Sequence, residues 1–524
     1  MDAKSSVQRL PWAKWALWSA GAGLLVAASC SDVTVIEMLG TSSPGGGGSA
    51  ATTSTTGGSA GTGGHGGGTG LAGGGGALGG TGGDGGIGLA GGGGGTGGTG
   101  GSGATGGDAG GSPPCGDGVR DGMETDVDCG GPECPPCADC LSCTVATDCT
   151  TGWCEPATHT CAPRWLDIAV GDDNSCSRKS DGSLWCWGDN VAGQIGNGTF
   201  VPLEPLPSQV SALGTSVAQA AVGSKFTCGL EIDRRLWCWG RNDHGQLGQG
   251  GVSADQPSPA QVTALGSSVA KVALGVGHGC AVKLNGSLWC WGENADGQLG
   301  RGTTTAFEPA PGQVVAVGGS VADVSLGYSY TCARKTNGSL WCWGRNDHGQ
   351  LGDGTTSGSS LPVQVTALGA SVAEISLGYA HACVRKTNGS LWCWGNNPDG
   401  EVGDGSQADR DSPVQISVLG TSVATVSLGY MHTCASKTDG SLWCWGSNWA
   451  QQLGSEIPFW AVSPLEVTAL GAPAETASLG HGHTCALTAG GLLWCWGWNE
   501  YGQLGDGTVL ESVWPLLVQT PACP

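Results

Sequence analysis

The sequence has few basic residues. Its 524 residues include 21 Lys and Arg against 43 Asp and Glu, which gives a formal net charge of −22 at pH 7. A protein that binds nucleic acid through the phosphate backbone needs a basic face. The acidic balance therefore excludes nucleic acid as the expected partner.

Long hydrophobic runs are also missing. The apolar stretch from Trp15 to Ser29 follows the basic residues Lys4, Arg9 and Lys14, and it is shorter than the about 20 residues that a membrane-spanning helix needs. Residues 1–29 are therefore expected to form an export signal. No other apolar segment is long enough to cross a membrane.

The end of this stretch predicts a lipid anchor. The run Val26-Ala27-Ala-Ser-Cys30 is similar to the cleavage box of bacterial lipoproteins, with Ala27 where Leu is usual. Cys30 is expected to carry the lipid, and residues 30–44 to form the anchor region. The alternative is ordinary signal cleavage, with Cys30 an incidental thiol. The protein is expected to be exported as an outer-membrane or cell-surface lipoprotein that touches the membrane only through its lipid, or else to be secreted.

The next segment consists almost entirely of Gly, Ala, Thr and Ser. Residues 45–114 contain too little apolar area to offset the entropy of ordering and are expected to stay disordered. A flexible linker of this length has a root-mean-square span of roughly 45 Å. It could hold a folded head clear of a membrane surface.

The rest of the chain shows no helical periodicity and instead repeats a short pattern. A Cys is followed nine residues later by Trp-Cys-Trp-Gly, and successive units start 52, 52, 52, 51, 51 and 51 residues apart. The repeat pairs Cys176 with Cys186, Cys228 with Cys238, Cys280 with Cys290, Cys332 with Cys342, Cys383 with Cys393, Cys434 with Cys444 and Cys485 with Cys495. A fixed period of this size predicts a repeat architecture.

One repeat contains four short strand patterns. Residues 322–326, 330–335, 339–343 and 362–368 form apolar or alternating runs, and Thr336-Asn-Gly338 between the second and third predicts a tight hairpin. In the third run, Trp341 and Trp343 share one face, opposite Leu340 and Cys342, so both faces are apolar. We therefore expect the strand and its tryptophans to lie in the core between neighbouring blades of a propeller.

The two ends of the repeat region favour a closed ring. A solenoid needs polar capping units, whereas the first unit (from Trp165) and the last (through Val518) keep the full apolar pattern. Seven units lie within the usual range for propellers. We expect Leu166–Val170 to pair beside the final segment at Leu516–Val518.

The repeat also resembles a known family. Gly480-x-x-His483-Thr-Cys485, followed by Trp496-Gly-x-Asn499 and Gly502-Gln-Leu-Gly505-Asp-Gly-Thr508, is similar to the regulator of chromosome condensation repeat. The resemblance implies an all-β fold, a seven-bladed β-propeller over residues 165–520. That family includes a nuclear guanine-nucleotide exchange factor, a plant ultraviolet photoreceptor and a secreted bacterial β-lactamase inhibitor, so the resemblance leaves the function open.

The cysteine count favours disulfides. Without Cys30, 24 of the 25 cysteines remain, an even number in a chain expected to be exported. Each of the seven repeat pairs should face its partner across a hairpin and form a disulfide that contributes somewhat less than the ~3 kcal/mol expected for a fifteen-residue loop. The alternative is a pair of free, buried thiols.

A separate Cys-rich module is expected at residues 115–163. Its nine cysteines are Cys115, Cys129, Cys134, Cys137, Cys140, Cys143, Cys149, Cys154 and Cys161. This density is typical of a small domain held together by disulfides, and it resembles modules of bacterial surface lipoproteins. The odd number predicts a bridge to Cys523, with the other pairings left open. The alternative is a metal site at Cys134, Cys137, Cys140 and Cys143.

The same module offers weak candidates for a cation site. Oxygen ligands gather at Asp117, Asp121, Glu124, Asp126 and Asp128, where calcium could bind. Their spacing does not match the EF-hand, so a solvated loop is the competing interpretation. No other cofactor or metal is expected.

Catalytic motifs are absent from the sequence. It shows no paired carboxylates, nucleophile elbow or phosphate loop. Four histidines precede the first repeat Cys by two residues, but other repeats hold Asn174, Phe226 or Tyr330 there; the four are His278, His381, His432 and His483. A position that accepts Phe and Tyr is structural, and we expect the protein not to be an enzyme.

Binding residues need not repeat, so the departures from the repeat are the candidate partner-binding residues. These are Trp449, Phe459 and Trp460 in the sixth unit, Arg234 and Arg235 in the second, and Trp498 and Tyr501 in the seventh. The alternative is local repacking of irregular loops.

Together these features predict a monomeric, lipid-anchored surface protein whose propeller loops bind a protein or glycan without catalysis. The alternatives are a secreted enzyme inhibitor similar to the β-lactamase-binding relative, and nucleotide exchange, which export disfavours. An ultraviolet sensor built on the tryptophans and a hydrolase or lyase in the central channel are weaker alternatives.

Overall fold

We describe the protein from a computed structural model. The structure describes residues 120, 125–127, 129, 134, 136–138, 141–150, 153–154, 159–457 and 459–519. All belong to the compact unit Ala104–Pro524, and none to the unit Met1–Gly103. Several sequence predictions lie outside the described residues: the export signal, the Cys30 anchor, the Gly-rich linker, Cys115, Cys140, Cys523, Asp117, Asp121, Glu124 and Asp128.

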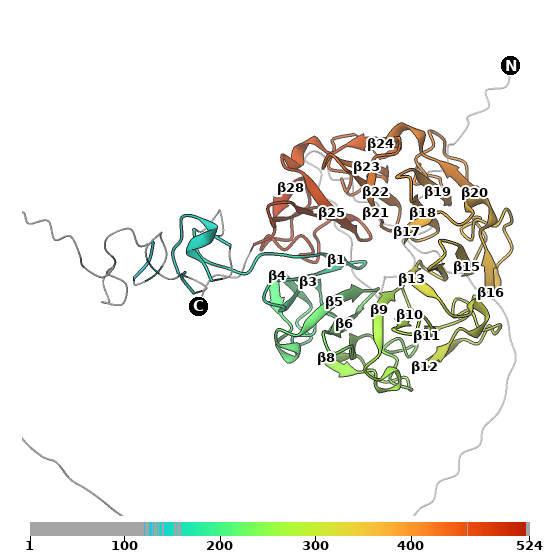
Figure 1. Ribbon diagram of the computed structural model, residues 1–524, viewed down its shortest axis with the longest axis horizontal. Coiled ribbons are helices and arrows are strands. Elements are labelled where there is room, and N and C mark those ends of the chain that lie inside the picture. The colour runs from blue at the N-terminus through green and yellow to red at the C-terminus, as the bar shows by residue number, and fades with distance from the viewer. Residues whose placement is uncertain are drawn as a thin grey trace, which may run out of the picture. The chain divides into compact units, whose positions relative to one another are not determined.

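Residues 169–517 form seven four-stranded antiparallel sheets arranged in a ring. In each sheet the strand order follows the chain, from an inner strand beside the ring axis to an outer strand at the rim (Figure 1). The prediction of an all-β, seven-bladed propeller is confirmed. Blade 1 contains β1 to β4, and each following blade takes the next four strands.

The strands occupy equivalent positions in every blade. The inner strands are β1 (Ala169–Val170), β5 (Val217–Val222), β9 (Val269–Leu274), β13 (Val321–Leu326), β17 (Val372–Leu377), β21 (Val423–Leu428) and β25 (Ala474–Leu479). The second strands are β2 (Asn174–Arg178), β6 (Phe226–Glu231), β10 (His278–Lys283), β14 (Tyr330–Lys335), β18 (His381–Lys386), β22 (His432–Lys437) and β26 (His483–Thr488). The third strands are β3 (Leu184–Asp189), β7 (Leu236–Gly240), β11 (Leu288–Glu293), β15 (Leu340–Gly344), β19 (Leu391–Gly395), β23 (Leu442–Ser447) and β27 (Leu493–Gly497). The outer strands are β4 (Leu203–Gln209), β8 (Gln256–Gln261), β12 (Phe307–Gln313), β16 (Ser359–Gln364), β20 (Arg410–Gln415), β24 (Trp460–Glu466) and β28 (Ser512–Leu517).

The hairpin between the second and third strands sets the cysteine register. In blade 4, Asn337 Oδ1 accepts hydrogen bonds from the Ser339 backbone N–H (3.0 Å) and hydroxyl (2.8 Å). Gly338 adopts a φ of +80°, and a Cβ there would lie 2.6 Å from the Ala370 carbonyl oxygen. This turn places Cys332 directly opposite Cys342.

All seven repeat cysteine pairs are disulfides in the structure. Their Cα atoms lie 4.0–4.1 Å apart across the second and third strands, and both cysteines of every pair are at most 1% exposed. Each blade therefore has a covalent link inside its hydrophobic core, which favours disulfides over the alternative of free thiols. In blade order the bridges join Cys176 to Cys186, Cys228 to Cys238, Cys280 to Cys290, Cys332 to Cys342, Cys383 to Cys393, Cys434 to Cys444 and Cys485 to Cys495.

The predicted fourth strand at residues 362–368 is placed too late. In the structure β16 is Ser359–Gln364, and Thr366–Leu368 forms the 3-10 helix η6. Gly369, at a φ of +64°, closes this turn, which buries Leu368 to 2% exposure. The alternating letters that resembled a strand therefore belong to a turn with one side chain in the core. Its equivalents are η3 (Ser211–Leu213), η4 (Thr263–Leu265), η5 (Val315–Val317), η7 (Ser417–Leu419) and η8 (Thr468–Leu470).

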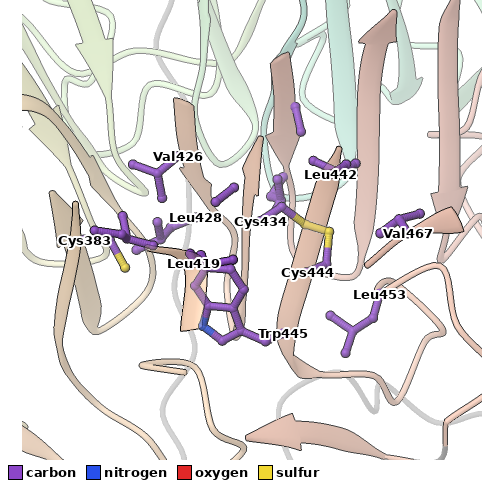
Figure 2. Close-up of a cluster of buried hydrophobic side chains, with 14 of the residues drawn as sticks. Cys383, Leu419, Val426, Leu428, Cys434, Leu442, Cys444, Trp445, Leu453 and Val467 are labelled. Atoms are coloured by element: carbon purple, nitrogen blue, oxygen red, sulfur yellow. A yellow bond between two sulfur atoms is a disulfide. The ribbon is translucent and has the colours of Figure 1, made fainter. Parts of the chain in front are cut away.

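The core lies between neighbouring blades. The second Trp of each third strand is fully buried and packs on the preceding blade: the Trp343 Nε1–H donates to the Gln298 carbonyl at 2.9 Å. Gly300 makes room for it, since a Cβ at this residue would lie 2.6 Å from Trp343 Nε1. Figure 2 shows one such core, in which Trp445 lies near Leu419 and beside the Cys434–Cys444 bridge.

The first Trp of each third strand is only half-buried, contrary to the expectation that both would be core. The ε-ammonium groups of Lys283, Lys386 and Lys437 lie 4.2–5.6 Å from the centroids of such rings. Because Lys ends the second strand and Trp is the second residue of the third, the hairpin brings the ammonium over the ring. The exposed part of the indole therefore makes a cation–π contact.

The ring closes by side-chain packing and not by the predicted strand pairing. β1 pairs with β2 inside blade 1, whereas β28 is the outer strand of blade 7 and pairs with β27. Trp165, Val518 and Leu516 belong to one hydrophobic cluster. The chain starts each blade at the axis and leaves it at the rim, so its two end strands cannot share a sheet.

Blades 7 and 1 meet through the same contacts as the other blades. Trp187 Nε1–H donates to the Gln503 carbonyl at 2.9 Å, and the Ser175 hydroxyl donates to the same oxygen at 3.1 Å. These bonds match the Trp343–Gln298 bond and the Thr331–Gln298 bond between blades 3 and 4. The closing junction therefore has the same tryptophan hydrogen bond as the other six.

The described part of the Cys-rich module is cross-linked by disulfides. They join Cys129 to Cys137, Cys143 to Cys154 and Cys149 to Cys161, and Cys134 is also disulfide-bonded. The Cys143, Cys149 and Cys161 sulfurs gather within 4.8 Å of one another. Of the four cysteines of the alternative metal site, Cys134, Cys137 and Cys143 are disulfide-bonded and so offer no thiolate to a metal, whereas Cys140 lies outside the described residues.

Asp126 is the one calcium candidate among the described residues. Its carboxylate accepts backbone hydrogen bonds from Val127 (2.7 Å) and Ser142 (2.5 Å). These bonds hold the pKa of Asp126 below its usual value. The carboxylate therefore stabilises a loop.

The short 3-10 helix η2 (Ala146–Asp148) lies nearby in the sequence. Among the described residues no helix has the length and apolarity to span a membrane.

Candidate binding face

The strand order gives the propeller two different faces. The connections between first and second strands and between third and fourth strands lie at one end of the blades, which we call the loop face. The hairpins between second and third strands and the connections to the next blade lie at the other end, the hairpin face. Residues on different faces cannot contribute to one compact site.

A single position in the loop face carries aromatic rings in neighbouring blades. It directly follows the Gly at the end of each inner strand and lies beside the ring axis. In blades 1 to 7 the residue is Asp172, Ser224, Val276, Tyr328, Tyr379, Tyr430 and His481. Since the fold accepts Asp, Ser and Val there, the scaffold does not require an aromatic ring.

These rings are in contact around the axis. The ring centroids are 4.5 Å apart for Tyr328 and Tyr379, 4.2 Å for Tyr379 and Tyr430, and 4.4 Å for Tyr430 and His481. All four side chains are half-buried, so each keeps an exposed part. They form a continuous row across blades 4 to 7.

The row continues onto the loops of blades 6 and 7. His481 lies 5.8 Å from Trp449 and 5.4 Å from Trp498, and the two indoles are 5.3 Å apart. Tyr501 lies 6.0 Å from Trp498. We call Tyr328, Tyr379, Tyr430, His481, Trp449, Trp498 and Tyr501 the aromatic arc.

The structure brings three predicted binding residues together in this arc: Trp449, Trp498 and Tyr501. Phe459 and Trp460 lie at the rim of the same face, with their rings 6.0 Å apart. Trp449 and Phe459 both line a hollow of ≈ 340 Å³. The unusual loop of the sixth unit therefore extends the aromatic surface outward from the axis.

Arg234 and Arg235 do not join this surface. They form the hairpin turn of blade 2, with Arg234 at a φ of +72°, and so lie on the hairpin face. The Arg235 guanidinium pairs with Asp233 at 3.1 Å. Their departure from Asn-Gly changes the turn and not the candidate site.

The arc borders a small cavity on the ring axis. Its volume is ≈ 120 Å³, and it is lined by the last residues of the inner strands and by the glycines that follow them. Ligand pockets usually measure about 300–1,000 Å³. The cavity is too small for a ligand of that size, so a partner would lie across the arc and not inside the axis.

Carboxylates surround the arc at both ends and near its middle. Burial raises the pKa of Tyr328, and Tyr379 and Glu293 raise it further. Burial also raises the pKa of Tyr430, with Asp172 among the nearby charges that add to the effect. These effects place acidic groups within electrostatic range of the rings.

The same is true of the Tyr501 end. Burial raises the pKa of Tyr501, and Asp173, Asp189 and Glu500 raise it further. Burial raises the pKa of Asp173, and the negative charges of Asp172 and Asp189 raise it further, to about 7. The cluster of Asp172, Asp173 and Asp189 can therefore hold or release a proton near neutral pH.

This cluster of three carboxylates was not predicted from the sequence. Asp172 and Asp173 follow β1, whereas Asp189 ends β3, where the Gln194 amide donates to it at 2.8 Å. The three are spread over eighteen positions and match no known motif, so no pattern of paired carboxylates marks them in the sequence. The available signal was the adjacent pair Asp172-Asp173, whose first residue stands where blades 4 to 6 have Tyr.

The basic side chains of the loop face are already engaged. Each forms an ion pair with an acidic residue of the same face: Lys225 with Asp189, Arg241 with Asp243, Arg301 with Glu308, Arg345 with Asp347, and Arg410 with Asp404. Asp172, Glu293, Asp296 and Glu500 have no such partner among the described Lys and Arg residues. The exposed part of the arc therefore lies in a negative potential.

The four histidines before the repeat cysteines occupy a buried structural position. His278, His381 and His483 are at most 1% exposed, and their Nε2 atoms lie 2.9–3.0 Å from a Thr or Ser hydroxyl of the next blade. Burial lowers the pKa of each of the three to about 3. They stay neutral and connect blades.

Blade 5 carries one chemical exception in its loop. Glu401 stands where the other blades hold Gln, and it is fully buried. One carboxylate oxygen accepts the Asp399 N–H at 3.0 Å, and the other has no hydrogen-bond partner among the described residues. Burial raises the pKa of Glu401 to about 8, so at neutral pH it resembles the amide that it replaces.

Comparison with known proteins agrees with this architecture. The model of the RCC1-like domain matches residues 251–522, and models of the Regulator of chromosome condensation (RCC1) repeat match residues 181–230, 165–194 and 217–246. The chain is 30% identical over 364 residues to the Ultraviolet-B receptor UVR8 of Arabidopsis thaliana, which covers 68% of this chain and 81% of that protein.

Other relatives share the domain in different settings. The RCC1 domain-containing protein RUG3, mitochondrial, of Arabidopsis thaliana is 29% identical over 62% of this chain and 79% of its own length. The human E3 ubiquitin-protein ligase HERC2 is 30% identical over 64% of this chain, but the match spans 7% of that much longer protein.

Two solved structures have the same fold. The TM-score is 0.60 for Prp20p from Saccharomyces cerevisiae (19% identity, 68% of this chain, 88% of that chain) and 0.59 for human WBSCR16 (22% identity, 65% of this chain, 94% of that chain). At these identities the likeness concerns the fold alone. With the domain match over more than half of the sequence and the relative at 30% identity, this chain belongs to the RCC1-like domain family.

Proposed function

We propose that this chain is an exported, lipid-anchored surface protein whose propeller binds a protein or glycan partner through its loop face, without catalysing a reaction. The observation that carries the proposal is the aromatic arc. Four of its rings, those of Tyr328, Tyr379, Tyr430 and His481, occupy the position that blades 1 to 3 fill with Asp, Ser and Val, so these rings are not needed for folding. Partly exposed aromatic side chains of this kind are the usual anchors of interfaces.

The family relationship supports a binding role. Prp20p from Saccharomyces cerevisiae has binding properties to Gsp1p and histones, and the 30% identical Arabidopsis relative is a receptor. Those partners belong to those proteins. What this chain shares with Prp20p is the fold, and what it shares with the Arabidopsis relative is 30% sequence identity.

The proposed location rests on the order of the segments. A basic start, a short apolar run, Cys30 and a long Gly-rich linker precede the folded residues. We expect the mature protein to carry its lipid on Cys30. Cys30→Ser should move the protein from the membrane fraction to the soluble fraction, and mass spectrometry of the N-terminal peptide would show unmodified residues. Membrane retention of the variant would contradict the anchor.

The binding role is tested with the full chain, purified in detergent and immobilised. We expect it to retain a saturable partner from cell-envelope or secreted fractions. Tyr379→Ser/Tyr430→Ser, which introduces the residue that blade 2 has at this position (Ser224), should reduce retention at least tenfold. Arg234→Ala/Arg235→Ala on the hairpin face is the matched control and should retain the partner. Equal retention by both variants would overturn the assignment of the loop face.

A secreted inhibitor would use the same surface for a different partner. If the retained protein is a hydrolase and its activity falls on binding, the inhibitor alternative replaces the proposed role as a lipid-anchored binding protein. The measurement is the hydrolase activity in the presence of the wild-type chain and of Tyr379→Ser/Tyr430→Ser.

A further inference from the structure

We propose that the aromatic arc and its carboxylates recognise a cationic protein segment, one rich in Arg or Lys. This inference rests on the proposed binding function of the loop face and names the chemistry of its partner. Three observations lead to it: the continuous row of rings, the carboxylates around the row, and the engagement of the basic side chains on the same face.

Aromatic rings in contact offer a surface that attracts cations. A guanidinium or ammonium group is drawn to the face of a ring, and more strongly where water is excluded. Tyr328, Tyr379, Tyr430 and His481 follow one another at 4.2–4.5 Å. Alternate side chains of an extended segment are about 6.6–7 Å apart. The row is therefore long enough for two side chains of such a segment to lie on it.

The carboxylates lie on the loop face beside the rings: Asp172 lines the axial cavity together with Tyr328, Tyr379 and Tyr430, and Glu500 directly precedes Tyr501. Glu293 and Asp296 act on the Tyr328 end of the arc, and Asp172 acts on its centre at Tyr430. Glu500 acts on the Tyr501 end. Arg and Lys can combine an aromatic contact with a carboxylate partner. The arc supplies both groups along its whole length.

The remaining charges of the face select against other partners. Lys225, Arg241, Arg301, Arg345 and Arg410 are each held by a carboxylate of the loop face. None of these five is therefore left for an anionic partner, and the unpaired carboxylates repel one. A neutral glycan could stack on the rings and donate hydroxyl groups to the carboxylates, but it brings no positive charge to balance the carboxylates that have no Lys or Arg partner. Of the two proposed partner classes, a basic protein segment fits better.

The first experiment measures fluorescence anisotropy of a fluorescein-labelled nonapeptide of alternating Arg and Ser, titrated with the full chain. We expect saturable binding that weakens as salt is raised, because the contacts are between charges. Tyr379→Ser/Tyr430→Ser and Asp172→Asn/Glu500→Gln should each weaken binding at least tenfold. Asp411→Asn/Glu511→Gln removes two charges at the outer strands β20 and β28 and should weaken it less than twofold.

Two results would overturn the inference. One is equal weakening by both carboxylate variants, which would mean attraction to net charge alone. The other is that the wild-type chain does not bind the peptide, although it retains a native partner that Tyr379→Ser/Tyr430→Ser does not retain. The proposed binding function would then stand, but with a partner of different chemistry. Displacement of that partner by a neutral hexasaccharide, but not by the Arg peptide, would identify it as a glycan. Circular dichroism of each variant separates these results from misfolding.

Discussion

His432 Nε2 lies 2.9 Å from Thr484 Oγ1 across the boundary between blades 6 and 7. The Thr484 hydroxyl donates its own proton to the Gln452 carbonyl at 2.8 Å. The Nε2 atom must therefore be the donor to Thr484, which leaves Nδ1 without a proton. Nδ1 has no hydrogen-bond partner among the described residues, so a second proton there would be buried and unpaired. Burial accordingly holds the pKa of His432 well below its usual value.

The buried histidines predict a loss of stability in acid. Burial lowers the pKa of His278, His381 and His483 to about 3, against 6.5 for an exposed His. The unfolded chain takes up these protons below pH 6.5 and the folded chain does not, so the free energy of unfolding falls as the pH drops from 6.5 toward 3. At pH 5 each His should cost about 2 kcal/mol. Urea unfolding at pH 7.5 and 5.0 measures the loss.

A substitution isolates this effect from the carboxyl groups that titrate in the same range. His432→Phe introduces the residue that blade 2 has at this position, Phe226. The variant should lose about 2 kcal/mol less than the wild type between pH 7.5 and pH 5. If the two proteins show the same pH dependence, the buried histidines do not control acid stability.

Glu401 predicts a stabilising substitution. Burial raises the pKa of Glu401 from 4.5 to about 8, so its contribution to stability is complete below pH 4.5 and is lost as the pH rises toward 8. Glu401→Gln removes this loss and should raise the free energy of unfolding at pH 7 by about 3 kcal/mol, with no gain at pH 4. Thermal unfolding at the two pH values measures the difference.

The reverse substitution is the control for Glu401. Gln298 occupies the same position in blade 3, and its Oε1 accepts the Asp296 N–H at 3.0 Å. Gln298→Glu should destabilise the protein at pH 7 and leave it unchanged at pH 4. A gain in stability from both substitutions would show that the buried proton is not the cause.

The blade disulfides predict a moderate and redox-dependent contribution to stability. Cys332 and Cys342 close a short loop inside the blade 4 core. Cys332→Ala/Cys342→Ala should lower the free energy of unfolding by about 2–3 kcal/mol under oxidising conditions. At a dithiothreitol concentration that reduces all seven bridges, the difference in the free energy of unfolding between variant and wild type should shrink to the loss of packing alone. A difference that is the same with and without reductant would argue against the bridge.

The loop glycines predict a steric effect that two substitutions separate from backbone strain. Gly300 and Gly250 have φ values of +71° and +87°, but a Cβ at Gly300 would lie 2.6 Å from Trp343 Nε1, whereas open space surrounds Gly250. Gly250→Ala should cost about 1–2 kcal/mol from the backbone alone. Gly300→Ala should cost about 1–3 kcal/mol more, because Trp343 must move. Equal losses in urea unfolding would contradict the proposed packing of the blades.

Much of the fold could be predicted because its determinants are local in the sequence. The turn Thr336-Asn-Gly338 fixes the hairpin, and the hairpin fixes Cys332 opposite Cys342. The end of the blade could not be placed in this way. Whether Thr366–Leu368 continues a strand or turns depends on Gly369 and on the pocket that receives Leu368, and that pocket belongs to the tertiary structure.

The site was predicted only in part, for a related reason. Trp449, Trp498 and Tyr501 stood out because they depart from the repeat. Tyr379 and Tyr430 were not among the predicted binding residues, although the residue at their position varies between blades. Only the ring geometry makes them neighbours, with centroids 4.2 Å apart although they come from different blades.

The closing junction has a consequence for how such chains can be rearranged. No strand is shared between blades 7 and 1, and Trp165 and Val518 lie in one hydrophobic cluster, so the described ends of the ring are neighbours. A chain in which these ends are joined and a new start is made before Val217 would contain the same seven sheets and the same seven junctions. The propeller therefore has no privileged first blade: its gene could be circularly permuted at any blade boundary, or shuffled in whole-blade units, without breaking a β-sheet.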